Sequence, residues 1–378
     1  MDVFINKAGK FLPNEPVGND DMEAYLGMVD GKPSKARAIV LRRNGIKRRY
    51  YALDKEGNTT HSNPQMAALA IRELLADGMT TDDIDLLACG TSTPEQILPS
   101  HASMVHGELG GSRHMEIVSF AGSCCTGVDA LKYAYMAVKL GEHVNAVVSA
   151  SERPSAWLKA SYFQNESEQL ALLEQQPMLA FEKDFLRWML SDGAFALLLQ
   201  GKPNGLGLSL RIDWIELTSF AGTLQTCMYA GAEKLADGRL KGWADYPQQE
   251  WLGKSLFALK QDTRLLAANI VKRGVDFLLE MGKKHGFTPD DIDWFLPHLS
   301  SMFFKDKILE ESRERGFLIP EDKWFLNLPH IGNIGSASAF AMIEELFGSG
   351  RLRKGQKILL MVPESARFSY CYCMLTVV

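Results

Sequence analysis

The sequence predicts an α/β protein built from two structurally related halves. One observation is a repeat: Thr81-Asp-Asp-Ile-Asp precedes an apolar run, and Pro289-Asp-Asp-Ile-Asp precedes a similar run 208 residues later. A second match keeps the same offset, because the passage around Cys125 recurs around Asn333. Two matches at one offset indicate a duplicated fold with a pseudo-twofold axis. Apolar runs of strand length alternate with helical segments in both halves, which is typical of α/β folds with largely parallel sheets.

The first half yields a series of strands and helices in chain order. A proline at the start of a helix and a glycine just after its end mark the boundaries of the helices. A continuous apolar run indicates a strand that is buried on both faces. On these grounds we expect strands at 2–7, 86–90, 117–120, 144–150 and 194–199, with helices starting at Asn19, running from Asn63 to about Asp77, and spanning 125–140.

The halves are expected to divide at the Gly- and Pro-rich segment Gly201-Lys-Pro-Asn-Gly-Leu-Gly. This gives an N-terminal half at 1–203 and a C-terminal half at 204–378. Residues 153–190 interrupt the alternation and are interpreted as an insertion over the core. Its aromatic-rich part, 156–190, is either an ordinary surface helix or a lid or wall of a binding cavity. A second irregular segment at about 218–256 precedes a long helix at about 260–286.

Composition narrows the class of protein. The chain has 378 residues, with 46% hydrophobic and 23% charged residues, as expected of an ordinary globular protein. A net charge of −5 argues against general affinity for nucleic acid or an anionic membrane. No run of about 18 apolar residues could span a bilayer. The six cysteines lack zinc-like spacing, so we expect no metal and reduced thiols in a cytoplasmic protein.

Cys125 lies where a predicted buried strand gives way to a helix. A thiol at a helix N-terminus is near unpaired amide N–H groups and the positive end of the helix dipole, which lower its pKa and favour the thiolate. Cys125 is therefore a candidate nucleophile whose side chain points into a cavity, while Cys124 packs into the core. The alternative is that both cysteines are small buried hydrophobic residues.

The repeat brings two further polar residues toward the same region. His298 ends a strand and corresponds to Gly90 in the first half, while Asn333 corresponds to Cys125. His and Asn side chains supply N–H donors that stabilise an oxyanion. The alternatives are a structural histidine and a turn asparagine.

These segments resemble the thiolase superfamily and, within it, the ketoacyl-ACP synthase III branch. The resemblance lies in Cys125-Thr-Gly, Pro297-His298, Gly332-Asn333 with Ser336-Ala-Ser, Arg43-Asn-Gly-Ile and Ser191-Asp-Gly-Ala. It covers nearly the whole chain. It implies a five-layer αβαβα fold, an acyltransferase that uses coenzyme A or acyl carrier protein thioesters without a cofactor, and a homodimer. Arg43 would lie near the mouth of the tunnel for the pantetheine arm.

Two departures from the family pattern suggest a divergent subgroup. The expected Gly-rich loop near the C-terminus is here Pro363-Glu-Ser-Ala-Arg-Phe, in which the amide of Ala366 would complete an oxyanion hole. The segment after the histidine reads Leu299-Ser-Ser rather than Gln-Ala-Asn. The subgroup that these features suggest is the cyclising ketosynthases of dialkylresorcinol and stilbene pathways. It implies condensation of a β-ketoacyl thioester with an acyl or α,β-unsaturated acyl thioester.

Condensation without decarboxylation requires a base. Some relatives place a Glu in a loop near the dimer interface, where this chain has Leu98. Glu152, just after the buried strand at 144–150, is the substitute that the sequence offers. The alternative is that Glu152 pairs with Arg153 or another surface cation.

Other interpretations remain open at the level of sequence. The basic stretch at 32–49 is either a solvated face or a contact for acidic carrier protein or coenzyme A phosphates. The acyl-enzyme could transfer to an alcohol or amine rather than to carbon. The chain could also be a non-catalytic partner of a condensing heterodimer, although that role does not need Cys, His and Asn together.

Overall fold

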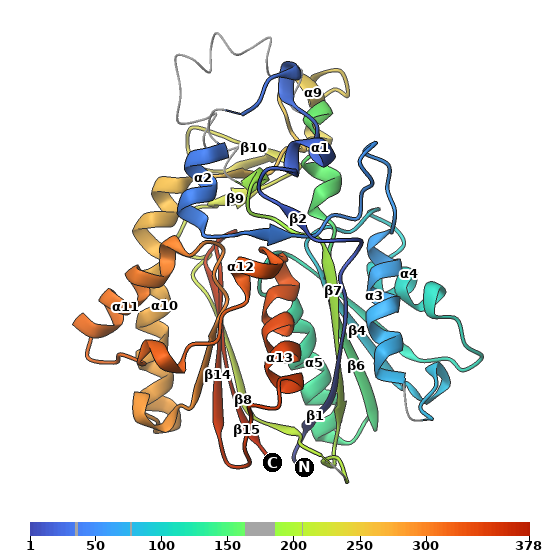
Figure 1. Ribbon diagram of the computed structural model, residues 1–378, viewed down its shortest axis with the longest axis vertical. Helices are drawn as coiled ribbons and strands as arrows, with labels where there is room; N and C mark the ends of the chain where they lie inside the picture. Colours follow the sequence, from blue (N-terminus) through green and yellow to red (C-terminus); the bar gives the residue numbers. More distant parts are fainter. Residues whose placement is uncertain (35–36, 76–77, 163–185, 206) are drawn as a thin grey trace.

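The computed structural model describes residues 1–34, 37–75, 78–162, 186–205 and 207–378. Its elements stack in five layers, in the order helix, sheet, helix, sheet, helix (Figure 1). The middle layer holds α5 (Thr126–Leu140) and α13 (Ser338–Gly348), with one sheet on each side. The outer layers hold α10 (Thr263–His285) with α11 (Phe303–Glu314), and α3 (Asn63–Arg72) with α4 (His101–Leu109). The five-layer α/β prediction is confirmed.

Nine strands make up the two sheets, in the order β13-β14-β15-β8-β1-β7-β6-β4-β5. The hydrogen bonding is continuous through this order, and the two sheets of the layered fold join where Phe4 and Ile5 of β1 pair with β8. One sheet comprises β1 (Phe4–Phe11), β7 (Gly193–Gln200), β6 (Asn145–Glu152), β4 (Leu86–Thr91) and β5 (Glu116–Ala121). The other comprises β8 (Leu210–Ser219), β15 (Ser369–Val377), β14 (Lys357–Glu364) and β13 (Trp294–Pro297).

The sheets are mixed, so the prediction of largely parallel sheets is wrong. Strands β6, β4 and β5 run parallel to one another, as do β13 and β14. The remaining pairings in this sheet order are antiparallel. The physical reason is connectivity: β14 and β15 are joined by a short hairpin, and a hairpin forces antiparallel pairing.

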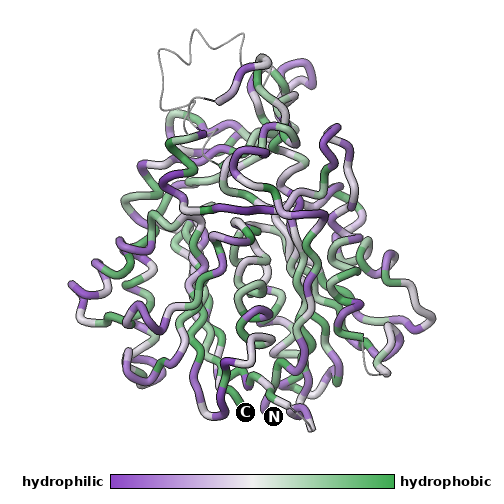
Figure 2. The backbone as a smooth tube through the Cα atoms, in the orientation of Figure 1, coloured by the Kyte–Doolittle hydropathy of each residue, from purple (hydrophilic) through white to green (hydrophobic). Residues whose placement is uncertain are grey.

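Apolar side chains fill the space between the layers. The largest cluster packs α5 and α13 between the two sheets. A second cluster lies under α10 and α11, and a third lies under α3 and α4. Figure 2 shows hydrophobic segments concentrated in the central helices and strands, with hydrophilic segments in many of the outer turns. Helix α5, with Cys125 at its N-cap, therefore starts in the most buried layer of the molecule.

The duplication is visible in the structure. The turns at Thr81–Asp83 and Pro289–Asp291 each carry the same capping box, in which a threonine hydroxyl and its backbone N–H donate to an aspartate three residues later. The strands that follow, β4 and β13, begin 208 residues apart. The division of the halves at 203/204 remains a prediction, with β7 and β8 on either side of it.

Shorter elements cap one end of the layers, where the two insertions were expected. Most of the first insertion, 163–185, lies outside the described residues. The second contains small strands rather than irregular chain. These elements are α1 (Met22–Leu26), α2 (Arg37–Asn44), α9 (Glu250–Gly253), α12 (Leu328–Ile331), β2 (Val17–Gly18), β3 (Arg48–Arg49), β9 (Met228–Tyr229), β10 (Ala232–Lys234), β11 (Leu240–Gly242) and β12 (Lys260–Gln261).

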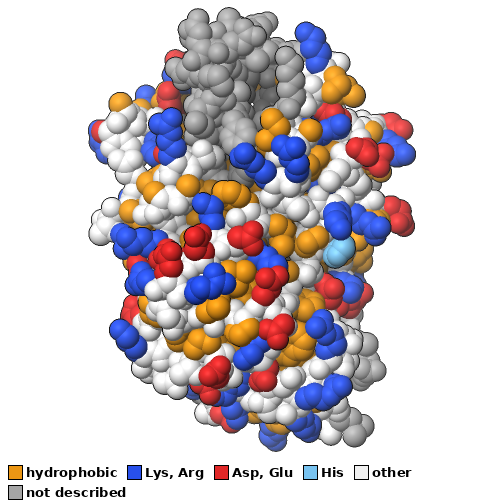
Figure 3. All heavy atoms as spheres, turned by 60° about the vertical axis from the view of Figure 1, so that its left-hand side comes forward, with side chains coloured by type: hydrophobic (Ala, Val, Ile, Leu, Met, Phe, Trp, Pro, Cys, Tyr) orange, Lys and Arg blue, Asp and Glu red, His pale blue; other side chains and the backbone are white. Residues whose placement is uncertain are grey.

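The described surface is mixed in character. Figure 3 shows Lys and Arg side chains interspersed with Asp and Glu over the face that comes forward from the left of Figure 1. This visible face carries no extended region of one charge. Within the described ranges, no helix has the length and apolar character needed to cross a membrane.

Candidate active site

The turn between β5 and α5 is packed tightly against its surroundings. A Cβ on Gly90 of β4 would lie 2.5 Å from the Thr126 carbonyl oxygen. A Cβ on Gly127 would lie 2.5 Å from the carbonyl oxygen of Ser336, at the equivalent turn of the second half. Only glycine allows the backbones to approach so closely. These glycines therefore bring the Cys and Asn turns of the two halves together.

The structure reverses the predicted orientation of the two cysteines. Cys125 is the N-cap of α5 and belongs to the central core, where its Sγ donates to the Val362 carbonyl oxygen at 3.4 Å. Cys124 is half-buried and lines two cavities that Cys125 does not line. The position of the helix start explains the difference. Helix α5 begins at Thr126, so the side chain of its N-cap, Cys125, points toward β14, and the side chain of Cys124 faces the cavities.

Neither thiol has the low pKa expected of a cysteine at a helix N-terminus. Burial raises the pKa of Cys124 to about 12, with further increases from the negative charges of Glu364 and Glu152. Burial also raises the pKa of Cys125 well above its usual value, as does Glu364. The helix dipole is therefore outweighed by desolvation and by nearby carboxylates.

The larger of the two cavities has a volume of about 250 Å³. Cys124, Asn333, Glu152 and Ala366 all line it. Its apolar wall includes Trp157, Leu158, Leu186 and Leu190, at the two ends of the first insertion. The cavity thus combines a thiol, an amide and a carboxylate with space for an apolar chain.

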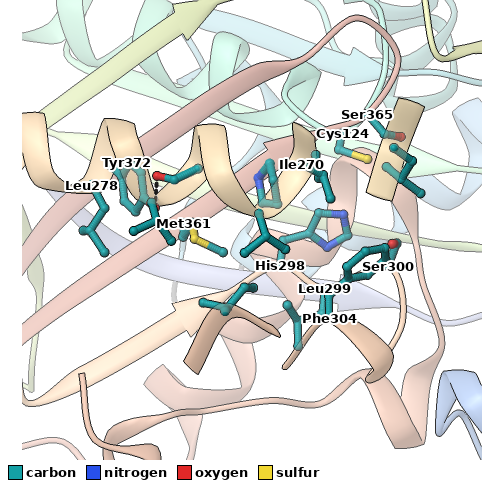
Figure 4. Close-up of a pocket in the computed structure, with 16 residues that line it drawn as sticks. Cys124, Ile270, Leu278, His298, Leu299, Ser300, Phe304, Met361, Ser365 and Tyr372 are labelled. Atoms are coloured by element: carbon teal, nitrogen blue, oxygen red, sulfur yellow. Dashed lines mark hydrogen bonds between the residues drawn. The ribbon is translucent and has the colours of Figure 1, made fainter. Parts of the chain in front are cut away.

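The smaller cavity, of about 40 Å³, runs between α10 and α11 (Figure 4). His298 and Cys124 both line it, with apolar side chains such as Ile270 and Leu278 along its length. Burial lowers the pKa of His298 to about 4, so the imidazole is neutral at neutral pH. Cys124, Ser300 and Ser365 line both cavities, so the two spaces meet at the thiol.

Asn333 is fixed by its backbone and by its own side chain. Its N–H donates to Met189 O at 3.1 Å, and its carbonyl accepts from Ser191 N at 2.9 Å. Its Oδ1 accepts from Gly335 N at 3.0 Å. With the oxygen engaged, the amide NH₂ is the group left to donate toward a ligand in the cavity.

Glu152 is held by hydroxyl and amide donors rather than by a cation. Its Oε1 accepts from the amides of Ser92 (2.9 Å) and Ser336 (3.2 Å), and from the Ser336 hydroxyl (2.5 Å). Its Oε2 accepts only from hydroxyls, those of Ser92 at 2.8 Å and Thr93 at 2.6 Å. Arg153 instead pairs with Glu95 at 2.8 Å. The alternative of an ion pair between Glu152 and Arg153 is therefore wrong.

The three residues predicted to bind substrate have different positions. Ala366 lines the larger cavity, and its carbonyl accepts from the amides of Cys227 and Met228. Leu98 lies in the loop before α4 and is 83% exposed. Arg43 is exposed on α2. Of these three, only Ala366 lines either of the cavities that meet at Cys124.

Glu364 is a residue of this region that the sequence reasoning missed. It is the last residue of β14, and its Oε2 accepts from the Cys125 amide at 3.0 Å. The missing glycines of the segment at 363–368 were the signal that could have identified it, because a carboxylate occupies part of the expected Gly-rich loop.

Comparisons with known proteins show which enzymes this chain is similar to. Residues 283–363 match the family model described as 3-oxoacyl-[acyl-carrier-protein] synthase III C terminal. The chain is 24% identical to the β-ketoacyl-[acyl-carrier-protein] synthase III of Deinococcus deserti, over 96% of this chain and 87% of that protein. It is 26% identical to the enzyme of the same name from Cereibacter sphaeroides, over 94% of each chain. The chain is ketoacyl-ACP synthase III-like.

Solved structures of other proteins have the same thiolase fold as this chain. AbyA1, a tetronic acid condensing enzyme, superposes with a TM-score of 0.75 at 19% identity, covering 99% of both chains. A Cys-to-Ser variant of Xanthomonas campestris OleA with bound lauric acid and lauroyl-CoA also gives 0.75 at 19% identity, covering 100% of this chain and 99% of OleA. The sequence relatives and the family model indicate that this chain is an acyl-transferring condensing enzyme.

Proposed function

We propose that the protein joins two acyl thioesters through an acyl-Cys124 intermediate. One substrate is a β-ketoacyl thioester, and the other is an acyl or α,β-unsaturated acyl thioester. The product is a cyclised compound of the dialkylresorcinol or cyclohexanedione type. The observation that carries this proposal is the meeting of two cavities at one thiol: the larger, of about 250 Å³, has an apolar wall, and the smaller is lined by His298.

The first condensation, which gives a linear thioester that precedes ring closure, balances without a cofactor. Cys124 Sγ attacks the first thioester, the acyl group moves to sulfur, and the released carrier thiol leaves with the proton of Cys124. The second thioester then loses a proton from the carbon between its two carbonyls. That carbon attacks the acyl-Cys124 carbonyl, a carbon–carbon bond forms, the carbon–sulfur bond breaks, and Cys124 recovers a proton.

Intact-protein mass spectrometry tests the proposal in two stages. Lauroyl-CoA is a suitable first probe because OleA binds it. We expect a mass increase of one acyl group, and then loss of that group after a β-ketoacyl thioester is added, with a product containing both chains. Transfer of the acyl group to an added alcohol or amine would instead support an acyltransferase. Absence of loading across a panel of acyl-CoA and carrier-protein thioesters would overturn both assignments.

His298 and Asn333 are proposed to donate N–H groups to the oxyanion of the second thioester. Replacing either residue by Ala should leave acyl-Cys124 formation intact and reduce condensation by about 10²–10³-fold, the usual loss for one oxyanion donor. Single-turnover mass spectrometry separates the two steps. Asn269→Ala is a matched control, because that amide bonds only within α10. Wild-type condensation by either site variant would contradict the assignment.

We propose that the protein is a homodimer in which the β5 edge and the Leu98 loop meet the partner. Strand β5 ends the sheet with one side unpaired, and an open edge invites pairing. The nearby side chains of Ile97 and Leu98 are 76% and 83% exposed. Light scattering at micromolar concentration should give twice the 42.1 kDa chain mass.

A lysine at either exposed position should weaken the dimer, because a charge would be buried at the interface. Leu252→Lys provides the control, since Leu252 is 62% exposed on the distant α9. A monomer for the wild-type protein would contradict the proposal, as would equal dissociation caused by the control.

A further inference from the structure

Glu364 bonds the backbone on both sides of Cys124. Its Oε2 accepts from the Cys125 amide at 3.0 Å, and the Ser123 amide also donates to its carboxylate. The carboxylate therefore spans the turn that presents the thiol. A negative group at the start of α5 also complements the positive end of the helix dipole.

The charges around this turn are mainly acidic. Asp129, in the first turn of α5, acts on Glu364, and Glu152 of β6 acts on Cys124. The buried Cys125, Cys371 and Tyr370 side chains and the neutral His298 imidazole are further titratable groups in the region. Lys132 acts on Asp129, whereas the charged groups that act on Cys124 are the carboxylates of Glu364 and Glu152.

We propose that Glu364 is a positioning residue that clamps the Cys124 turn by its two flanking amides and holds a negative charge beside the thiol. The inference rests on the proposed role of Cys124. Its consequence is that resting Cys124 remains a protonated thiol, because burial and the negative charge of Glu364 both disfavour a thiolate at this position. Acylation removes that conflict, since a thioester sulfur carries no charge. The arrangement favours the acyl-enzyme over a free thiolate.

Alkylation of Cys124 by iodoacetamide tests the charge directly, since only the thiolate reacts. Glu364→Gln retains an oxygen that accepts an amide bond but removes the charge. We expect the pH profile of Cys124 alkylation to move downward by about one pH unit or more. At a fixed pH below the midpoint, this raises the alkylation rate about tenfold per unit. Peptide mapping separates Cys124 from Cys125.

Two further variants separate charge from folding. Glu364→Asp keeps the charge on a shorter side chain and should retain slow alkylation even if the turn loosens. Glu344→Gln removes a carboxyl that pairs with Lys10 elsewhere and should leave the profile unchanged. An unchanged profile in folded Glu364→Gln would overturn the inference, as would fast alkylation in both Glu364 variants. The readout does not depend on product formation, so an acyl group found on Cys125 would refute the proposed function separately.

Discussion

Replacing Cys124 by Ala should abolish acyl loading, while replacing Cys125 by Ala should leave loading in place. Of the two cysteines, only Cys124 lines the two cavities, so its sulfur is the one that can meet a thioester carbonyl there. Cys125 faces the core and bonds to the Val362 carbonyl. Removing its buried sulfur should cost about 1 kcal/mol of unfolding free energy, comparable to one buried methylene group.

Intact-protein mass spectrometry after incubation with lauroyl-CoA checks both variants under identical conditions. Thermal unfolding establishes that each variant is folded before loading is compared. Peptide mapping of the wild-type protein identifies the modified cysteine. Loading that survives in Cys124→Ala and disappears in folded Cys125→Ala would return the nucleophile to the position that the sequence motif suggested.

The duplicated fold could be predicted from sequence because its evidence is a spacing. The turns at Thr81 and Pro289 have the same side-chain chemistry at the same offset, and the same capping boxes form in both. The repeat register also aligned His298 with Gly90. The structure explains why the two positions differ, since the backbone at Thr126 leaves no room for a side chain at Gly90.

The choice between two adjacent cysteines could not be made in the same way. Successive side chains of a helix point about 100° apart. If the helix starts one residue earlier or later, a different side chain faces the cavity and its neighbour faces the core. Helix starts are uncertain by one or two residues when judged from sequence. The pKa expectation failed for a related reason, because burial and the carboxylates of Glu364 and Glu152 come from distant parts of the chain.

Glu152→Gln should preserve acyl loading and reduce condensation of a β-ketoacyl donor by about 10²–10⁴-fold, the usual contribution of a general base. We propose this role because Glu152 lines the cavity that contains Cys124. Amides anchor its Oε1, whereas its Oε2 meets only the hydroxyls of Ser92 and Thr93. A hydroxyl can rotate and become an acceptor, so Oε2 can take up a proton without leaving a donor unpaired.

The same geometry predicts that Glu152→Gln folds. The glutamine oxygen can keep the two amide bonds, and its NH₂ can donate to the two hydroxyls after they rotate. A malonyl-type donor supplies the matched comparison, because loss of carbon dioxide creates the carbanion without a base. Condensation of that donor should therefore be reduced far less than condensation of the β-ketoacyl donor. Equal losses with both donors would indicate that Glu152 only supports the turns at Ser92 and Ser336, and wild-type rates with both donors would exclude Glu152 from the reaction.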